Sequence, residues 1–205
     1  MQRKKHVPES KKAMYRAIKT RFLQGVMFMR EWLKSPRSMG TICPSSASLA
    51  RAMAARVGND SNGLVIELGA GTGCVTEALL SSGIAPERLL VIERSESMVA
   101  LLRGKFPNIA IVHGDAARLS TYIPEGKHVD CIVSSLPFAS LDGETKGKII
   151  SEMKKNVTDG KILQFTYVLS SGHILARSGF TCVSATTVWK NLPPAKVMEF
   201  IAQHE

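Results

Sequence analysis

The chain has 205 residues, of which 44% are hydrophobic and 21% charged, and its formal net charge is +10. This length and composition fit one folded domain, or one domain with an appendage, and they exclude a disordered chain. The four cysteines match no zinc or redox spacing, so we expect reduced thiols, a cytoplasmic location and no metal site. No apolar run approaches the roughly 18–20 residues of a membrane-spanning helix, and the N-terminus lacks the compact apolar region of a signal peptide.

The excess positive charge lies in the first 40 residues, which contain 11 Lys and Arg and two acids. Apolar side chains repeat there at helical spacing, namely Met14, Ile18, Phe22, Val26, Met29 and Leu33. A basic amphipathic helix of this kind suits the surface of an anionic membrane. We therefore predict a membrane-binding helix within residues 1–40 and a separate domain over residues 41–205. A solvated basic helix and a helix packed on its own domain stay open as alternatives.

From residue 61 onward, short apolar runs alternate with helical patterns, which predicts an α/β domain with a mostly parallel sheet covered by helices. A helix is expected over residues 45–57, before the first strand, and another begins near residue 76. The expected strands cover residues 64–68, 89–92, 109–112, 129–134, 161–167, 181–189 and 197–202.

The turn after the first expected strand reads ELGAGTG, residues 67–73. Glycines at alternate positions let the backbone turn tightly and approach a ligand closely. Glu93 follows the second strand, where a carboxylate can accept hydrogen bonds from the two hydroxyls of a ribose. Together these features predict a site for an adenosine-containing cofactor.

The same residues discriminate between cofactors. The GxGxG spacing differs from the dinucleotide fingerprint, and there is no GK[ST] motif for a nucleotide triphosphate. Glu67 would repel a pyrophosphate and favour a cationic amine or sulfonium, while Asp115 can accept a hydrogen bond from an adenine amino group. The pattern favours S-adenosylmethionine over NAD. The predicted cofactor-binding residues are Glu67, Gly69, Gly71, Gly73, Glu93, Arg94, Asp115, Ala116 and Ser134.

Seven segments carry a likeness to known proteins: 28–46 (FMREWLKSPRSMGTICPSS), 65–80 (VIELGAGTGCVTEALL), 91–95 (VIERS), 113–116 (HGDA), 134–138 (SSLPF), 164–167 (QFTY) and 191–195 (NLPPA). In them the chain resembles class I methyltransferases related to rRNA adenine dimethyltransferases, and more closely the bacterial phospholipid N-methyltransferases. The resemblance spans roughly residues 20–200. It implies a Rossmann-like sheet of seven strands with the last antiparallel. It also implies S-adenosylmethionine as cofactor and S-adenosylhomocysteine as product.

The segment SSLPF ends the fourth strand, where amino N-methyltransferases hold the target nitrogen. The adenine dimethyltransferases have Asn-Leu-Pro-Tyr there, whereas this chain has Ser135 and Phe138 at the Asn and Tyr positions. A serine is a weaker match for an arylamine but suffices for an alkyl amine, which is nucleophilic once deprotonated. We expect backbone carbonyls around Ser135 and Leu136, together with the Ser135 hydroxyl, to orient the amine. Tyr167 is expected to contact the head group. The predicted catalytic residues are Ser135, Leu136, Pro137, Phe138 and Tyr167.

The resemblance therefore implies methylation of phosphatidylethanolamine, and of its mono- and dimethyl forms, toward phosphatidylcholine at the inner face of the cell membrane. The expected partners are an anionic membrane surface and the phospholipid, with no nucleic acid and no obligate protein partner. Candidates for the general base, by residue type alone, are His113, Asp142, Glu144 and His173. The alternatives are an rRNA adenine N6-methyltransferase, a small-molecule amine methyltransferase and a non-catalytic protein with a cofactor fold.

Overall fold

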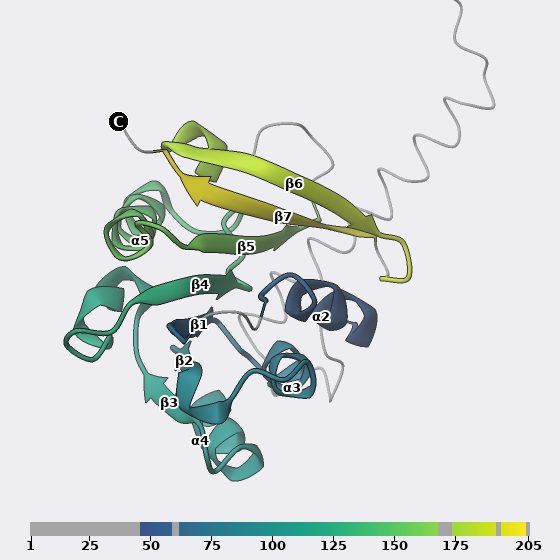
Figure 1. The fold of residues 1–205 in the computed structure, drawn as a ribbon, viewed down its shortest axis with the longest axis vertical. Helices are drawn as coiled ribbons and strands as arrows, with labels where there is room; N and C mark the ends of the chain where they lie inside the picture. Colours follow the sequence, from purple (N-terminus) through teal and green to yellow (C-terminus); the bar gives the residue numbers. More distant parts are fainter. Residues whose placement is uncertain (1–45, 59–61, 168–173, 192–193, 204–205) are drawn as a thin grey trace, which may run out of the picture. The chain divides into compact units, whose positions relative to one another are not determined.

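The computed structural model describes residues 46–58, 62–167, 174–191 and 194–203. The chain divides into two units, Met1–Pro44 and Ser45–Glu205. The predicted basic helix falls in the first unit, outside the described residues. The second unit is an α/β domain built on one sheet (Figure 1).

The sheet has seven strands in the order β3-β2-β1-β4-β5-β7-β6. Strand β7 is antiparallel to both of its neighbours, and the other adjacent pairs are parallel. The prediction of seven strands with the last antiparallel is therefore confirmed. The elements are α2 (Ala47–Ala54), β1 (Leu64–Leu68), α3 (Cys74–Ser81), η1 (Pro86–Arg88), β2 (Leu89–Glu93), α4 (Glu96–Lys105), β3 (Ala110–His113), η2 (Ala116–Thr121), β4 (Val129–Ser134), α5 (Gly143–Asn156), β5 (Lys161–Thr166), η3 (Leu175–Arg177), β6 (Phe180–Val188) and β7 (Ala195–Ala202).

Helices lie on both faces of the sheet, with α2 and α3 on one side and α5 on the other (Figure 1). Successive side chains of a strand point to opposite faces. In β1, Ile66 and Leu68 join the apolar cluster that includes α5, whereas Glu67 between them bonds to α3. The contribution of α5 to that cluster is Ile149, Ile150 and Met153.

The cysteines depart in part from expectation. Cys131 and Cys182 are free thiols, but Cys74 is disulfide-bonded. The expectation of four reduced thiols is wrong for Cys74, because sequence spacing does not show which cysteines come within bonding distance. Within the described residues, no group of three His, Cys, Asp or Glu side chains could hold a metal ion. No helix among them is long and apolar enough to cross a membrane.

Candidate cofactor and substrate site

The turns that follow β1, β2 and β4 are joined by backbone hydrogen bonds. Gly69 N–H donates to the Ile92 carbonyl at 2.9 Å, and Ser135 N–H donates to the Leu68 carbonyl at 2.9 Å. Parallel strands bring their carboxyl ends to one edge of a sheet, which is where ligands bind in open α/β folds. The predicted glycine turn and the SSLPF segment therefore meet at this edge.

All three glycines of the first turn have positive φ angles: 75° for Gly69, 55° for Gly71 and 83° for Gly73. Side chains other than glycine rarely adopt this backbone. A Cβ atom at Gly69 would lie 3.0 Å from Leu136 Cδ2, and one at Gly73 would lie 2.6 Å from the Phe106 ring. Gly69 thus allows contact with the SSLPF segment. Gly73 is predicted to bind cofactor, but the close approach of α4 is by itself enough to require glycine at this position.

Glu93 holds the first two turns together. Its Oε2 accepts from Gly71 N–H at 3.0 Å, and its Oε1 accepts from Ser95 N–H at 2.8 Å, just before α4. Each carboxylate oxygen can still accept a further hydrogen bond. The predicted ribose-binding acid is therefore fixed in place by the backbone of the predicted cofactor turn.

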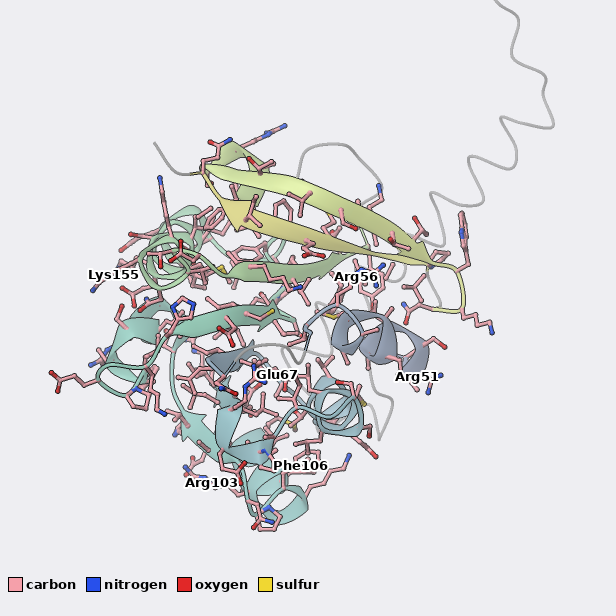
Figure 2. All side chains as sticks on the ribbon, in the orientation of Figure 1. Arg51, Arg56, Glu67, Arg103, Phe106 and Lys155 are labelled. Atoms are coloured by element: carbon pink, nitrogen blue, oxygen red, sulfur yellow. The ribbon has the colours of Figure 1, made fainter. Side chains whose placement is uncertain are left out.

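Glu67 is fully buried between β1 and α3, and it is labelled in Figure 2. Its Oε2 accepts a hydrogen bond from the Thr76 hydroxyl at 2.6 Å, whereas its Oε1 has no partner. Burial, with a smaller contribution from the nearby charge of Glu93, raises the pKa of Glu67 to about 7, against the lowering effect of its hydrogen bonds with Thr76. A buried carboxyl of this kind favours a cationic ligand, which would restore its charged form.

The turn after β3 is shaped by Tyr122, which sequence reasoning missed. Its hydroxyl accepts from Asp115 N–H at 3.2 Å, and its ring occupies the space that a Cβ at Gly114 would need. Asp115 Oδ1 accepts from Ala117 N–H at 2.9 Å and so caps η2. Of the other predicted cofactor residues here, Arg94 is exposed and Ala116 lies in the core.

The SSLPF segment is held by its neighbours. Ser134 is fully buried, and its hydroxyl accepts from Leu136 N–H at 3.4 Å. Ser135 Oγ is buried and has no hydrogen-bond partner. Phe138 is only 6% exposed and belongs to the apolar core, so its ring has little free surface for stacking on a ligand.

The Leu136 carbonyl does not have the freedom that we expected. It accepts from Phe138 N–H at 3.0 Å and from Gln164 Nε2 at 3.1 Å. A carbonyl oxygen has two lone pairs, and both are engaged. This argues against the predicted use of the Leu136 carbonyl to orient an amine.

Gln164, on β5, is the main residue that the sequence did not bring forward as a site residue. It is 1% exposed, and its Nε2 also donates to the Phe165 carbonyl at 2.7 Å. Its Oε1 is buried without a partner. In the QFTY segment, glutamine reads simply as a polar position in a strand.

Tyr167 follows β5 and is 8% exposed. Its ring packs edge-on against Phe165, with centroids 5.6 Å apart, and its hydroxyl is hydrogen-bonded to the Asn191 side chain. Burial raises the pKa of Tyr167. Asn191, from the NLPPA segment, also accepts from Ser46 N–H at 3.1 Å, so it joins the loop after β6 to the start of α2.

Three buried side-chain atoms in the described part of the chain have no hydrogen-bond partner: Glu67 Oε1, Ser135 Oγ and Gln164 Oε1. They come from β1, the end of β4 and β5, which are adjacent in the sheet. All three can accept hydrogen bonds, and an unpartnered buried polar atom is costly in a folded protein. Each of these atoms therefore suits a ligand group that carries an N–H or a positive charge.

Comparisons with known proteins agree with this chemistry. Residues 65–160 match the family model described as a methyltransferase domain. The chain contains a class I, S-adenosylmethionine-dependent methyltransferase domain. The fold of this methyltransferase resembles that of the glycopeptide N-methyltransferase MtfA complexed with S-adenosyl-L-homocysteine. The TM-score is 0.61 at 19% identity, over 82% of this chain and 95% of that one.

Two curated relatives differ in substrate. The methyltransferase is 28% identical to an ornithine lipid N-methyltransferase of Singulisphaera acidiphila over 82% of this chain and 91% of that protein. It is 31% identical to ribosomal RNA small subunit methyltransferase A of Thermotoga petrophila over 58% of this chain and 44% of that protein. The second match thus spans less than half of the relative.

The candidate general bases have other roles where the structure describes them. Asp142 caps α5 by accepting from Thr145 N–H at 2.8 Å, and this hydrogen bonding lowers the pKa of Asp142. Glu144 is exposed and pairs with Lys148 at 2.7 Å. His113 is exposed, and its Nε2 lies 3.0 Å from the Arg94 carbonyl oxygen. His173 falls outside the described residues.

Proposed function

We propose that this methyltransferase transfers methyl groups from S-adenosylmethionine to the amine of a membrane lipid, with phosphatidylethanolamine as the substrate. The observation that carries the proposal is Ser135 Oγ, a buried hydroxyl without a hydrogen-bond partner directly after β4. The similarity to a lipid N-methyltransferase over most of both chains supports a lipid amine.

The residues at the edge of the sheet fit the cofactor. Glu67 Oε1 is a buried acceptor for a cationic group, and Glu93 and Asp115 lie at the ends of the next two strands. Gly69 and Gly71 have positive φ angles and no Cβ atom, so the backbone at these two positions is open to close approach by a ligand. S-adenosylmethionine supplies an electrophilic methyl group when bound.

The task of the protein at the substrate is to expose a free lone pair on nitrogen. An alkylammonium group has a pKa of about 10, close to that of lysine. Transfer of the head group from water to a buried site favours its neutral form. The Ser135 hydroxyl then accepts a hydrogen bond from the amine and fixes its orientation, which is the main source of rate enhancement in a direct transfer.

Residues 1–40 are proposed to bring the enzyme to its substrate. They carry 11 basic residues and only two acids. Near an anionic leaflet each Lys or Arg contributes about 1 kcal/mol to binding. The protein would then act as a peripheral membrane enzyme on the inner face of the cell membrane.

The test is to incubate the full chain with methyl-labelled S-adenosylmethionine and one of three acceptors. These are vesicles of phosphatidylethanolamine with phosphatidylglycerol, vesicles of ornithine lipid with phosphatidylglycerol, and unmodified rRNA. We expect label in phosphatidylethanolamine. Label in ornithine lipid alone would keep the lipid class and change the head group. Label in RNA alone would replace the proposal with the second candidate, which rests on the similarity to rRNA methyltransferase A.

A further inference from the structure

We infer that Gln164 is a second acceptor for the substrate nitrogen, and that Gln164 and Ser135 together hold a primary amine with its lone pair free. The inference rests on the proposed function. It names a residue for substrate orientation and predicts which methylation states the enzyme prefers.

The orientation of the Gln164 amide is fixed by its neighbours. Its two N–H groups donate to the carbonyls of Leu136 and Phe165, at 3.1 and 2.7 Å. The opposite orientation would place the amide oxygen against two carbonyl oxygens and is therefore unfavourable. Gln164 Oε1 is thus the atom left over, and it is buried without a partner in a side chain that is 1% exposed.

Leu136 connects this amide to both halves of the site. Gln164 binds the Leu136 carbonyl, and Leu136 directly follows Ser135 in the chain. The Leu136 side chain lies against Gly69 of the cofactor turn, 3.0 Å from the position of a Cβ there. In the sheet, Gln164 is in register with Ser134. Gln164 therefore contacts the residue that follows Ser135, and that residue also contacts the cofactor turn.

Two acceptors match the valence of a neutral primary amine, which has two N–H bonds and one lone pair. If each N–H donates to one acceptor, the nitrogen lone pair takes part in no hydrogen bond and is free to attack a methyl group. Each transfer forms one N–C bond and breaks one S–C bond of the sulfonium. The first and second transfers each then release one proton from nitrogen to solvent, whereas the third converts the neutral tertiary amine of the dimethyl lipid into a quaternary ammonium and releases none. The N–H count therefore falls from two to one to none.

Every methylation thus leaves one more buried acceptor without a donor. We expect kcat/KM to fall about tenfold at each step from phosphatidylethanolamine to its monomethyl and dimethyl forms. The monomethyl lipid would accumulate before the later products.

The test compares Gln164→Met, Gln164→Glu and a surface control, Gln203→Met, whose side chain bonds only to Thr181 among the described residues. For each variant, kcat/KM is measured with the three lipids, and binding of S-adenosylhomocysteine is measured by calorimetry. Gln164→Met is expected to lower kcat/KM for phosphatidylethanolamine at least tenfold and for the dimethyl lipid less than twofold. In Gln164→Glu, burial at a position that is 1% exposed favours the protonated carboxyl, whose O–H can donate to one of the two carbonyls while the other oxygen remains an acceptor. This variant should therefore retain the preference for the primary amine, as should Gln203→Met.

Other results overturn the inference. An equal loss for all three lipids, or equal behaviour of Gln164→Met and Gln164→Glu, would make Gln164 a structural residue. If Gln164→Met fails to bind S-adenosylhomocysteine, Gln164→Glu decides alone, because loss of the primary-amine preference in that variant contradicts a role for the acceptor oxygen. A wild-type enzyme that methylates lipids without any preference would reject the inference and keep the proposed function. A wild-type enzyme that methylates no lipid would reject both.

Discussion

The Glu67 carboxyl accepts a hydrogen bond from the Thr76 hydroxyl at 2.6 Å and leaves its second oxygen buried and unpartnered. The first contact ties β1 to α3 directly behind the glycine turn. The second oxygen is available for a cation. Glu67 therefore links β1 to α3 through one carboxyl oxygen and leaves the other oxygen buried without a partner.

Replacement of Glu67 by Gln should stabilise the free protein and destroy cofactor binding. The folded pKa of about 7 lies above the ordinary value of 4.5, so the folded state takes up a proton more readily than the unfolded chain. The contribution of this carboxyl to stability is complete below about pH 4.5 and is lost as the pH rises through 7. At pH 8, Glu67→Gln should raise the free energy of unfolding by on the order of 1–3 kcal/mol.

The control for this variant is Glu87→Gln, which changes an exposed acid in η1. Denaturant unfolding at pH 5 and pH 8, together with calorimetry of S-adenosylhomocysteine binding, gives both readouts. We expect a smaller gain in stability at pH 5 and at least a hundredfold loss of affinity. Unchanged affinity in Glu67→Gln would remove Glu67 from the cofactor site.

The affinity of the wild-type protein for the cofactor should depend on pH. The ammonium group of S-adenosylhomocysteine prefers the ionised form of Glu67, which is depleted below about pH 7. The dissociation constant of S-adenosylhomocysteine should therefore rise by up to about tenfold per pH unit below 7 and be level above 8. Calorimetry in buffers of different ionisation enthalpy should detect proton release on binding near pH 6.5. A flat profile from pH 5.5 to 8.5 would contradict this assignment.

Gly73 and Gly104 should respond in opposite directions to alanine. At Gly73, φ is 83° and a Cβ would lie 2.6 Å from the Phe106 ring, so Gly73→Ala should cost about 2–4 kcal/mol of stability. At Gly104, inside α4, a Cβ meets nothing within 4 Å, so Gly104→Ala should stabilise by up to about 1 kcal/mol. Urea unfolding of both variants measures the difference. Equal effects would mean that Gly73 does not lie against the Phe106 ring as described.

Asn191 is expected to be a structural residue of the site edge. Asn191→Leu removes the bonds of this side chain to Ser46 N–H and to the Tyr167 hydroxyl, at a cost of about 2–4 kcal/mol. Tyr167→Phe removes only the second of these bonds and should cost about 1 kcal/mol. Thermal unfolding of the two variants tests this order. A milder effect for Asn191→Leu than for Tyr167→Phe would be inconsistent with the double contact.

The sheet could be read from the sequence because buried parallel strands are continuous apolar runs bounded by turn residues. The bounds expected for β1 and β4 agree with the structure, whereas β7 begins at Ala195, two residues earlier than expected. The turn after β1 was recognisable because positive φ at alternate positions demands glycine. Local patterns of this kind need no knowledge of distant contacts.

The contacts around the substrate position could not be read in this way. Gln164 reaches Leu136 only because β4 and β5 pair with Gln164 opposite Ser134. The occupied Leu136 carbonyl, the Tyr122 contact behind Asp115 and the bridge made by Asn191 likewise depend on register and loop paths. The sequence could supply residue types for the site, but not which of their polar atoms stay unpaired.

The basic segment gives a separate prediction. Deletion of residues 1–25 removes 8 of the 11 Lys and Arg within the first 40 residues. Sedimentation with vesicles that contain phosphatidylglycerol should fall to background, while binding of S-adenosylhomocysteine should be unchanged. Binding of the full chain should also weaken as salt is raised. Vesicle binding that survives the deletion would place the membrane contact elsewhere in the chain.

The most direct test of the account is mass spectrometry of vesicle lipids after incubation with the enzyme and methyl-labelled S-adenosylmethionine. The wild type is expected to place label on the nitrogen of phosphatidylethanolamine, with the monomethyl product formed first. Ser135→Ala loses no hydrogen bond within the described protein, so it should fold and bind cofactor normally but lose at least tenfold in rate. Methylation of rRNA without any labelled lipid, or full lipid activity in Ser135→Ala, would contradict the account.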